Sequence, residues 1–442
     1  MKILIPNTFV AERKYIVDIL FDEFLGLQYS VEIFSGKDYE LQFENNLKII
    51  IKDFFWSNID EKYGYLHQKY IPTSVEYYTN ELCPEANMPI IYGKPQIDIS
   101  EKLIICYVDI FASSFFMLTR WEELVCQQKD KYQRFPDTNS LSQKFSFYNR
   151  PIVNEYTELL WNLLQKVGVI QQRRIHKYEV IPTHDIDYLF KFNNLFNLFR
   201  AIAGDIIKLK SFKRAWKTIL DYFKIKHKKK LDPFDTFDYL MDISEQYNLK
   251  SHFYFIPGKI DENNIHYNIL NKKTIDIIKH ILQREHIVGM HASFCSYNNK
   301  EQMKKEKERL QKIIENIEES RQDYLRFENP TTWQILNDIG IKIDSTIGFA
   351  NTNGFRAGTC YTYSVFNVIK QQKLQIKEIP LIFMEQAGIR SNTSVEHFLI
   401  QILQLKEKVK RYNGKFVILW HNNNITNPYF EQYTSVYQNI FD

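Results

Sequence analysis

The stretch that most constrains the fold is residues 180–187, VIPTHDID, in which an apolar run leads directly into Asp185 and Asp187. Alternate residues of a β-strand share one face, so we expect both carboxylates at the same end of one buried strand. Burying two such acids is costly unless a cation or a reaction uses them. A helix-capping Asp beside a surface Asp explains this stretch equally well on its own, so the rest of the chain has to decide.

Composition limits the class of protein. The 442 residues suit two domains, and the 44% hydrophobic and 15% aromatic fractions predict ample core without extensive disorder. The net charge of +4 is too small to indicate a nucleic-acid binder. The five cysteines form no CxxC pair, and the N-terminus lacks the apolar length of a signal peptide. We therefore expect a protein of a reducing compartment, the cytoplasm.

Residues 1–175 predict a smaller mixed α/β domain. Apolar and alternating runs indicate strands near 3–5, 29–34, 47–54, 89–93 and 103–107, and helical periodicity indicates helices over 14–24, 109–126 and 153–167. This part of the sequence contains no metal-ligand cluster and no glycine-rich phosphate loop. We expect it to have a structural or substrate-presenting role.

Residues 176–442 predict a larger domain in which strands and helices alternate. Strands are expected at 251–256, 286–290, 323–327, 343–345, 374–382 and 416–420, with helices over 237–247, 273–283, 299–320, 330–340 and 394–411. This order is typical of a parallel sheet or a (β/α) barrel, whose functional groups lie at the carboxyl ends of the strands. The polar residues predicted at those ends are Asp185, Asp187, His291, Arg326 and His421.

A basic insertion at about 190–235 follows the first of these strands. Between Lys191 and Lys230 it holds twelve Lys or Arg against two acids, interleaved with Phe, Leu, Ile and Trp216. This pattern predicts a basic amphipathic helix or a helix pair. Such a helix could contact an anionic membrane surface or an anionic glycan. The alternative is a solvated helical face packed on the second domain.

Two acids and two histidines at strand ends can meet in one cleft and hydrolyse an amide or ester. Carboxylate and imidazole ligands hold a divalent metal with an open position, and such a metal activates water. A second carboxylate nearby can act as general base and a histidine as general acid.

The order of several short motifs resembles that of the polysaccharide deacetylases, carbohydrate esterase family 4. The motifs are Thr183-His184-Asp185-Ile186-Asp187, Gly289-Met290-His291-Ala292-Ser293, Tyr324-Leu325-Arg326-Phe327 and Leu419-Trp420-His421. They span residues 178–425. The run Gly354-Phe355-Arg356-Ala357-Gly358-Thr359 extends the resemblance to a divergent branch that carries an N-terminal α/β domain of this size.

The resemblance implies a distorted (β/α)7 barrel preceded by the smaller domain, a carbohydrate substrate and a divalent metal, with zinc the ion expected. By the same resemblance Asp185 is the base, Asp187 and His291 are metal ligands, and His421 is the general acid that protonates the leaving amine. Arg326, Arg356 and Trp420 are the expected substrate contacts. The planar guanidinium of Arg356 suits a carboxylate or phosphate; a loop-ordering salt bridge is its equally open alternative.

One position departs from the family pattern. Where the second motif has another His four residues on, this chain has Cys295. A Cys295 thiolate, or His184, could replace the lost metal ligand, although a free Cys is commonly a small hydrophobic residue.

Three functions follow from this reading. The first is a metal-dependent hydrolase that removes N- or O-acetyl groups from a carbohydrate such as a surface polysaccharide precursor. The second is a glycan-binding barrel without activity that has lost its metal. The third is a hydrolase of another amide or ester, because fold does not determine substrate.

Overall fold

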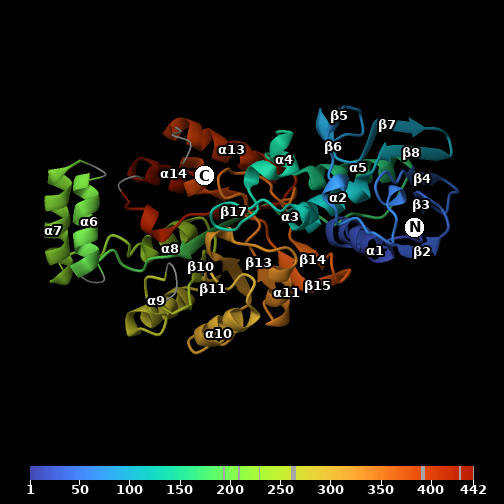
Figure 1. Cartoon of the computed structure of the whole chain (residues 1–442). Coiled ribbons are helices and arrows are strands. Elements are labelled where there is room, and N and C mark those ends of the chain that lie inside the picture. The colour runs from blue at the N-terminus through green and yellow to red at the C-terminus, as the bar shows by residue number, and fades with distance from the viewer. Residues whose placement is uncertain are drawn as a thin grey trace.

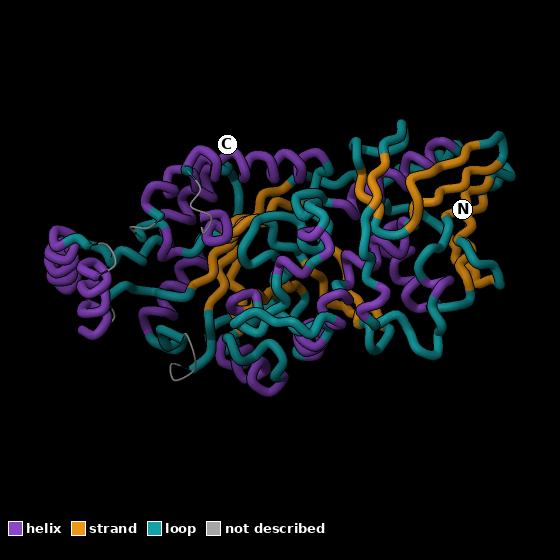
Figure 2. Tube along the Cα trace, turned by 45° about the horizontal axis from the view of Figure 1, so that its top comes forward, coloured by secondary structure: helices purple, strands orange, loops and turns teal. Residues whose placement is uncertain are grey.

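The computed structural model describes residues 1–192, 195–207, 210–227, 229–259, 265–389, 394–427 and 430–441. The chain forms an elongated body that contains two large β-sheets and carries a helical arm at one end (Figures 1 and 2). The N-terminal sheet lies at the end opposite the arm, and the larger sheet occupies the middle. None of the described helices has the length and apolar character needed to cross a membrane.

The smaller sheet has six strands in the order β2-β1-β3-β4-β8-β7. The pairs β1–β2 and β4–β8 are parallel and the other pairs are antiparallel, so the unit is mixed α/β. Every residue of helix α2 is buried, and all of them are apolar except Ser113, Ser114 and Thr119. The element bounds are β1 Lys2–Pro6, α1 Val10–Asp18, β2 Ser30–Phe34, β3 Tyr39–Gln42, β4 Lys48–Ile51, β5 Glu76–Tyr78, β6 Met88–Ile90, β7 Gly93–Ile99, β8 Leu103–Val108, α2 Ile110–Thr119, α3 Trp121–Val125, α4 Leu141–Lys144 and α5 Ile152–Lys166.

The single helix predicted over residues 109–126 is two helices. The Asp109 side chain caps α2 by accepting a hydrogen bond from the backbone N–H of Ala112. Arg120 then adopts a left-handed conformation, with φ 53°, and separates α2 from α3. A left-handed residue cannot continue a right-handed helix, and helical periodicity alone does not reveal it.

The larger sheet has nine strands in the order β14-β15-β13-β12-β11-β10-β9-β17-β16. All neighbouring pairs are parallel except β14–β15. The bounds are β9 Glu179–Ile186, α8 Phe237–Gln246, β10 His252–Phe255, α9 Lys272–Gln283, β11 Ile287–Ala292, α10 Lys300–Leu310, β12 Glu319–Gln322, α11 Thr331–Asp338, β13 Ile343–Asp344, β14 Tyr363–Asn367, β15 Gln372–Glu378, β16 Phe383–Met384, α12 Glu385–Ile389, α13 Val395–Arg411, β17 Lys415–Leu419 and α14 Thr434–Asn439.

Strand pairing does not close the larger sheet into the predicted (β/α)7 barrel. Among the described strands, the pairing leaves β14 and β16 as the two edges. Between β15 and β16, residues 379–382 hydrogen-bond on one side to Asp344 O (2.8 Å from Ile379 N) and on the other to Val417 O (3.2 Å from Ile382 N). Pro380 lies in this segment and has no N–H to donate, so a continuous ladder is interrupted there.

The prediction also misplaced the strand expected at 323–327. Helix α10 ends at Leu310, ten residues before its predicted end, and strand β12 is Glu319–Gln322. All four residues of β12 are polar and all four are buried, a combination that no hydrophobic pattern detects. Residues after Gln322 form a short 3₁₀ turn in which Tyr324 has a left-handed φ of 59°.

The basic insertion forms an antiparallel helix pair, α6 Leu195–Ile207 and α7 Phe212–Lys226. The pair stands away from the body at the end where β10 and α9 lie (Figure 1). Residues 193, 194, 208, 209 and 228 of the predicted insertion lie outside the described residues.

Candidate active site

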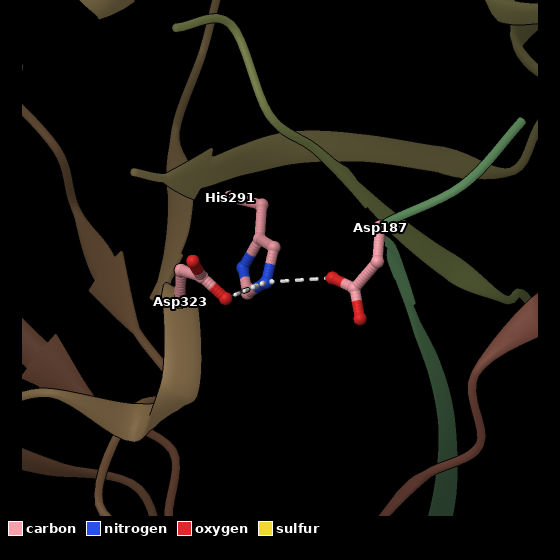
Figure 3. Close-up of side chains that lie close together, drawn as sticks. All are labelled: Asp187, His291 and Asp323. Atoms are coloured by element: carbon pink, nitrogen blue, oxygen red, sulfur yellow. Dashed lines mark ion pairs between the residues drawn. The ribbon is translucent and has the colours of Figure 1, made fainter. Parts of the chain in front are cut away.

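Four strand ends bring an acid–histidine cluster together at the carboxyl edge of the larger sheet. Asp185 lies near the end of β9 and Asp187 directly follows it. His291 lies in β11, and Asp323 and His421 follow β12 and β17. Because these strands are parallel, their carboxyl ends share one edge. Figure 3 shows the side chains of Asp187, His291 and Asp323 converging there.

His291 is the centre of this cluster. Its Nε2 atom lies 3.6 Å from Asp187 Oδ1, 3.7 Å from Asp323 Oδ1 and 3.8 Å from Asp185 Oδ2. Its Nδ1 atom lies 2.9 Å from the backbone oxygen of Arg321. A carbonyl oxygen can only accept, so Nδ1 carries the hydrogen. In the neutral ring the Nε2 lone pair therefore points at the three carboxylates, as a metal-ligating histidine requires.

His421 contacts the cluster through Asp187. Its Nδ1 atom lies 2.7 Å from Oε1 of the buried Glu385, and its Nε2 atom lies 3.8 Å from Asp187 Oδ2. The same Glu385 oxygen also accepts hydrogen bonds from the His421 backbone N–H and from Asn424 Nδ2. Glu385 thus holds the ring with its Nε2 edge toward the cluster.

Arg321 orients Asp185 by a hydrogen bond. Its Nη1 atom donates to Asp185 Oδ1 (3.1 Å) and to Thr183 Oγ1 (2.7 Å). Its Nε and Nη2 atoms donate to the backbone oxygen and to the hydroxyl of Ser345. Asp185 Oδ1 is engaged in this way, whereas Oδ2 faces His291. The guanidinium has no exposed surface, so Arg321 is a positioning residue that supplies a fixed positive charge behind Asp185.

Burial and neighbouring charges shift the pKa values of four groups in the cluster. Burial lowers the pKa of the His421 imidazole, but the charge and hydrogen bond of Glu385 outweigh it and raise the pKa to about 10. Burial also opposes protonation of His291, whose pKa the surrounding acids raise to about 9. Burial raises the Asp323 pKa to about 7 despite the nearby His291. Burial raises the pKa of Asp187 as well, but its contacts with His291 and His421 outweigh this and lower it.

The residues present fit a bound cation. Asp187, His291 and Asp323 each offer one ligand atom, and these atoms lie within 4.8 Å of one another. Asp187 Oδ1 is buried and has no hydrogen-bond donor, which is unfavourable for a carboxylate oxygen unless a cation neutralises it. Ligands about 2.1 Å from one tetrahedral ion lie about 3.4 Å apart, close to the 3.6 and 3.7 Å separations measured from His291.

The two residues considered as replacement ligands lie elsewhere. Asp187, His291 and Asp323 form a compact group of candidate ligands. Cys295 is exposed and is not part of this compact group. His184 points to the other face of β9, where its ring bonds Trp420 O (2.8 Å) and Ser251 Oγ (3.1 Å). Strand alternation sends His184 away from its two acidic neighbours.

The three predicted substrate contacts are also placed differently. Trp420 is 1% exposed and packs against Phe398 and Tyr437. The Arg326 guanidinium lies between the rings of Phe294 and Tyr297 and donates to the Phe294 carbonyl. Arg356 is buried and forms a two-point ion pair with Glu123 of the N-terminal unit, at 2.6 and 3.0 Å. The salt bridge that was one of the two alternatives for Arg356 is thus present, and substrate binding by Arg356 stays a prediction.

Sequence reasoning missed three residues of the site. Arg321 and Asp323 repeat the i, i+2 spacing of Asp185 and Asp187, and correct placement of β12 would have revealed them. Glu385 had no sequence signal, since it reaches the site only because β16 pairs with β17.

Aromatic side chains border the cluster. Tyr188, next to Asp187, stacks on His266 with ring centroids 4.1 Å apart. Tyr324, next to Asp323, lies 4.7 Å from the ring of Tyr132 of the N-terminal unit. His266 also lines a cavity of about 900 Å³ between the strand ends and the base of the helical arm.

Comparisons with known proteins cover parts of the chain. Residues 1–169 match the model of a family of unknown function, DUF7033. No curated protein matches the chain. A crystal structure provisionally described as a polysaccharide deacetylase from Mycobacterium smegmatis has 12% identity and a TM-score of 0.38, covering 61% of this chain and 85% of that one.

A second crystal structure, from Bordetella bronchiseptica, is provisionally described as a polysaccharide deacetylase involved in O-antigen biosynthesis. It has 8% identity and a TM-score of 0.31, and it covers 60% of this chain and 90% of that one.

Proposed function

We propose that the chain is a metal-dependent hydrolase that removes acetyl groups from a carbohydrate. The observation that carries the proposal is the environment of His291 Nε2, which faces Asp185, Asp187 and Asp323 while Nδ1 is fixed to a carbonyl. The motif order along the sequence points to the same chemistry.

Asp187, His291 and Asp323 would hold the divalent ion, with Asp323 in the place left by the missing second-motif histidine. When bound, this ion supplies Lewis-acid activation of water and of the acetyl carbonyl. Carboxylate and imidazole ligands suit zinc and its neighbours in the first transition row.

The chain's own residues supply the proton transfers. Arg321 fixes Asp185 through Oδ1 and leaves Oδ2 toward the cluster, where it takes the proton of the attacking water. His421, kept protonated by Glu385 with a pKa raised to about 10, gives a proton to the leaving amine or alcohol. The acceptor Asp185 Oδ2 and the donor His421 Nε2 would thus both face the same cluster of acids and histidine.

A carbohydrate is the proposed substrate because flat aromatic rings flank the cluster. The Tyr188–His266 and Tyr324–Tyr132 pairs offer surfaces on which the apolar face of a sugar ring can stack. We further propose that the domain boundary lies near residue 175, and that residues 379–382 close a distorted (β/α)7 barrel by bridging β13 and β17 through Asp344 and Val417.

The test measures acetate released from N-acetylated oligosaccharides by purified protein reconstituted with zinc, cobalt or nickel. Asp185→Asn should lower kcat by at least about 100-fold, while Cys295→Ala, the matched control, should keep activity. A panel of other acyl amides and esters separates sugar deacetylation from a different hydrolysis. Glycan binding by a metal-free protein without turnover would refute the hydrolase and favour a glycan-binding protein.

A further inference from the structure

The helical arm, α6 and α7, exposes an apolar stripe on each helix. Spacings of three, four or eight residues place the members of each set on one face. In α7 this stripe includes Phe212 and Trp216, which are 78% and 64% exposed. The stripe residues are Leu195, Phe199 and Ile207 of α6 and Phe212, Trp216, Leu220 and Phe223 of α7.

The stripes remain exposed although the arm is internally packed. Leu198 of α6 and Ala215 of α7 are buried, and the two helices pack against each other. Asp205 accepts a hydrogen bond of 2.6 Å from the Thr218 hydroxyl and ties the two helices together. The packing face of each helix is therefore occupied, and the stripes form a second apolar surface. Scattered single apolar residues need no explanation, but a continuous apolar surface marks an interaction site.

Positive charge is concentrated beside this surface. Lys213, Lys217 and Lys224 of α7 are exposed and each follows a stripe residue by one position, about 100° around the helix. Of the chain's 57 basic and 53 acidic residues, the segment 191–230 holds twelve and two, which leaves 45 and 51 for the remainder. Of its two acids, Asp205 is buried and Asp221 pairs with Lys230 at 2.8 Å.

We propose that α6 and α7 form a docking surface for an anionic lipid bilayer. In this arrangement the apolar stripes enter the boundary between headgroups and acyl chains, and the flanking lysines contact lipid phosphates. The arm projects from one end, so the acidic remainder stays clear of the anionic surface (Figures 1 and 2). A second copy is a poorer occupant, because two arms with the same strong positive charge repel each other. The proposal does not depend on the proposed hydrolase activity.

The test measures binding of the full-length protein to vesicles by co-sedimentation. Vesicles of phosphatidylcholine with phosphatidylglycerol should bind, vesicles of phosphatidylcholine alone should bind far less, and added salt should weaken binding. Replacing Lys213, Lys217 and Lys224 together by Ala should lower the partition coefficient by about 100-fold. Ile400→Ser with Leu403→Ser, on exposed positions of α13, is the matched control and should bind like the unaltered chain.

Trp216 provides a second readout. Its fluorescence should shift to shorter wavelength on binding, and Trp216→Phe should abolish the shift while keeping the binding. Equal affinity for neutral and anionic vesicles, or no binding to anionic vesicles at low salt, overturns the proposal. So does a dimer in lipid-free solution that Trp216→Ser dissociates, because the stripes would then be covered by a second copy.

Discussion

The buried ion pair between Arg356 and Glu123 allows a sharp test of whether Arg356 binds substrate or holds the two units together. Glu123 is 3% exposed and accepts hydrogen bonds from Arg356 and from Arg120 Nε, the latter at 2.9 Å. Glu123→Ala leaves the Arg356 guanidinium buried without a carboxylate, and removing one partner of such a pair costs about 3–5 kcal/mol. Glu318→Ala breaks the exposed pair with Lys342 and should cost less than about 1 kcal/mol.

The assay is urea unfolding followed by tryptophan fluorescence, together with substrate kinetics of each variant. We expect Arg356→Ala and Glu123→Ala each to lower the free energy of unfolding by about 3–5 kcal/mol. The double variant should lose clearly less than the sum, because the two losses share one interaction. KM should stay unchanged. A raised KM with unaltered stability in Arg356→Ala would refute this reasoning and return Arg356 to substrate binding.

Three further predictions concern the site and its surroundings. Glu385→Gln removes the carboxylate that raises the His421 pKa to about 10, so the alkaline limb of the pH–rate profile should move toward neutral pH; an unmoved limb assigns the acid elsewhere. Asp323→Asn should abolish most of the metal content measured by elemental analysis, whereas Cys295→Ala should not, and the reverse result would identify the thiolate as ligand. Burial lowers the His184 pKa to about 3, so only the unfolded chain binds this proton between about pH 3 and 6.5, and stability falls as pH falls. His184→Gln should remove about 2 kcal/mol of the loss in unfolding free energy between pH 7 and pH 5; an unchanged pH dependence would contradict it.

The local geometry of the first acidic strand was readable from the sequence. Apolar residues running into Asp185-x-Asp187 predicted a buried strand with both acids at one end, and alternation sent His184 to the other face. The strand–helix order predicted the parallel sheet, since crossover connections leave few other arrangements. These features could be predicted because strand alternation and the order of strands and helices depend on residues close together in the sequence.

Contacts between residues that are far apart in the chain could not be predicted from local sequence patterns. Whether Arg356 meets a substrate or Glu123 depends on a residue 233 positions away. Strand β12 is polar and buried, so its register, and with it Arg321 and Asp323, carries no hydrophobic pattern. Pro380 lies in the segment that connects β15 to β16 and has no N–H to donate, so the sequence does not show whether this segment completes a closed barrel.

The sequence by itself determined which chemistry-bearing residues end the strands, because strand alternation and strand–helix order are local properties. Only the tertiary structure decided which of them meet. The third member of the compact group is Asp323, from a neighbouring strand, and not Cys295, four residues from His291. The physical reason is that parallel strands gather side chains across the sheet, from residues far apart in the chain, whereas sequence spacing measures distance along it.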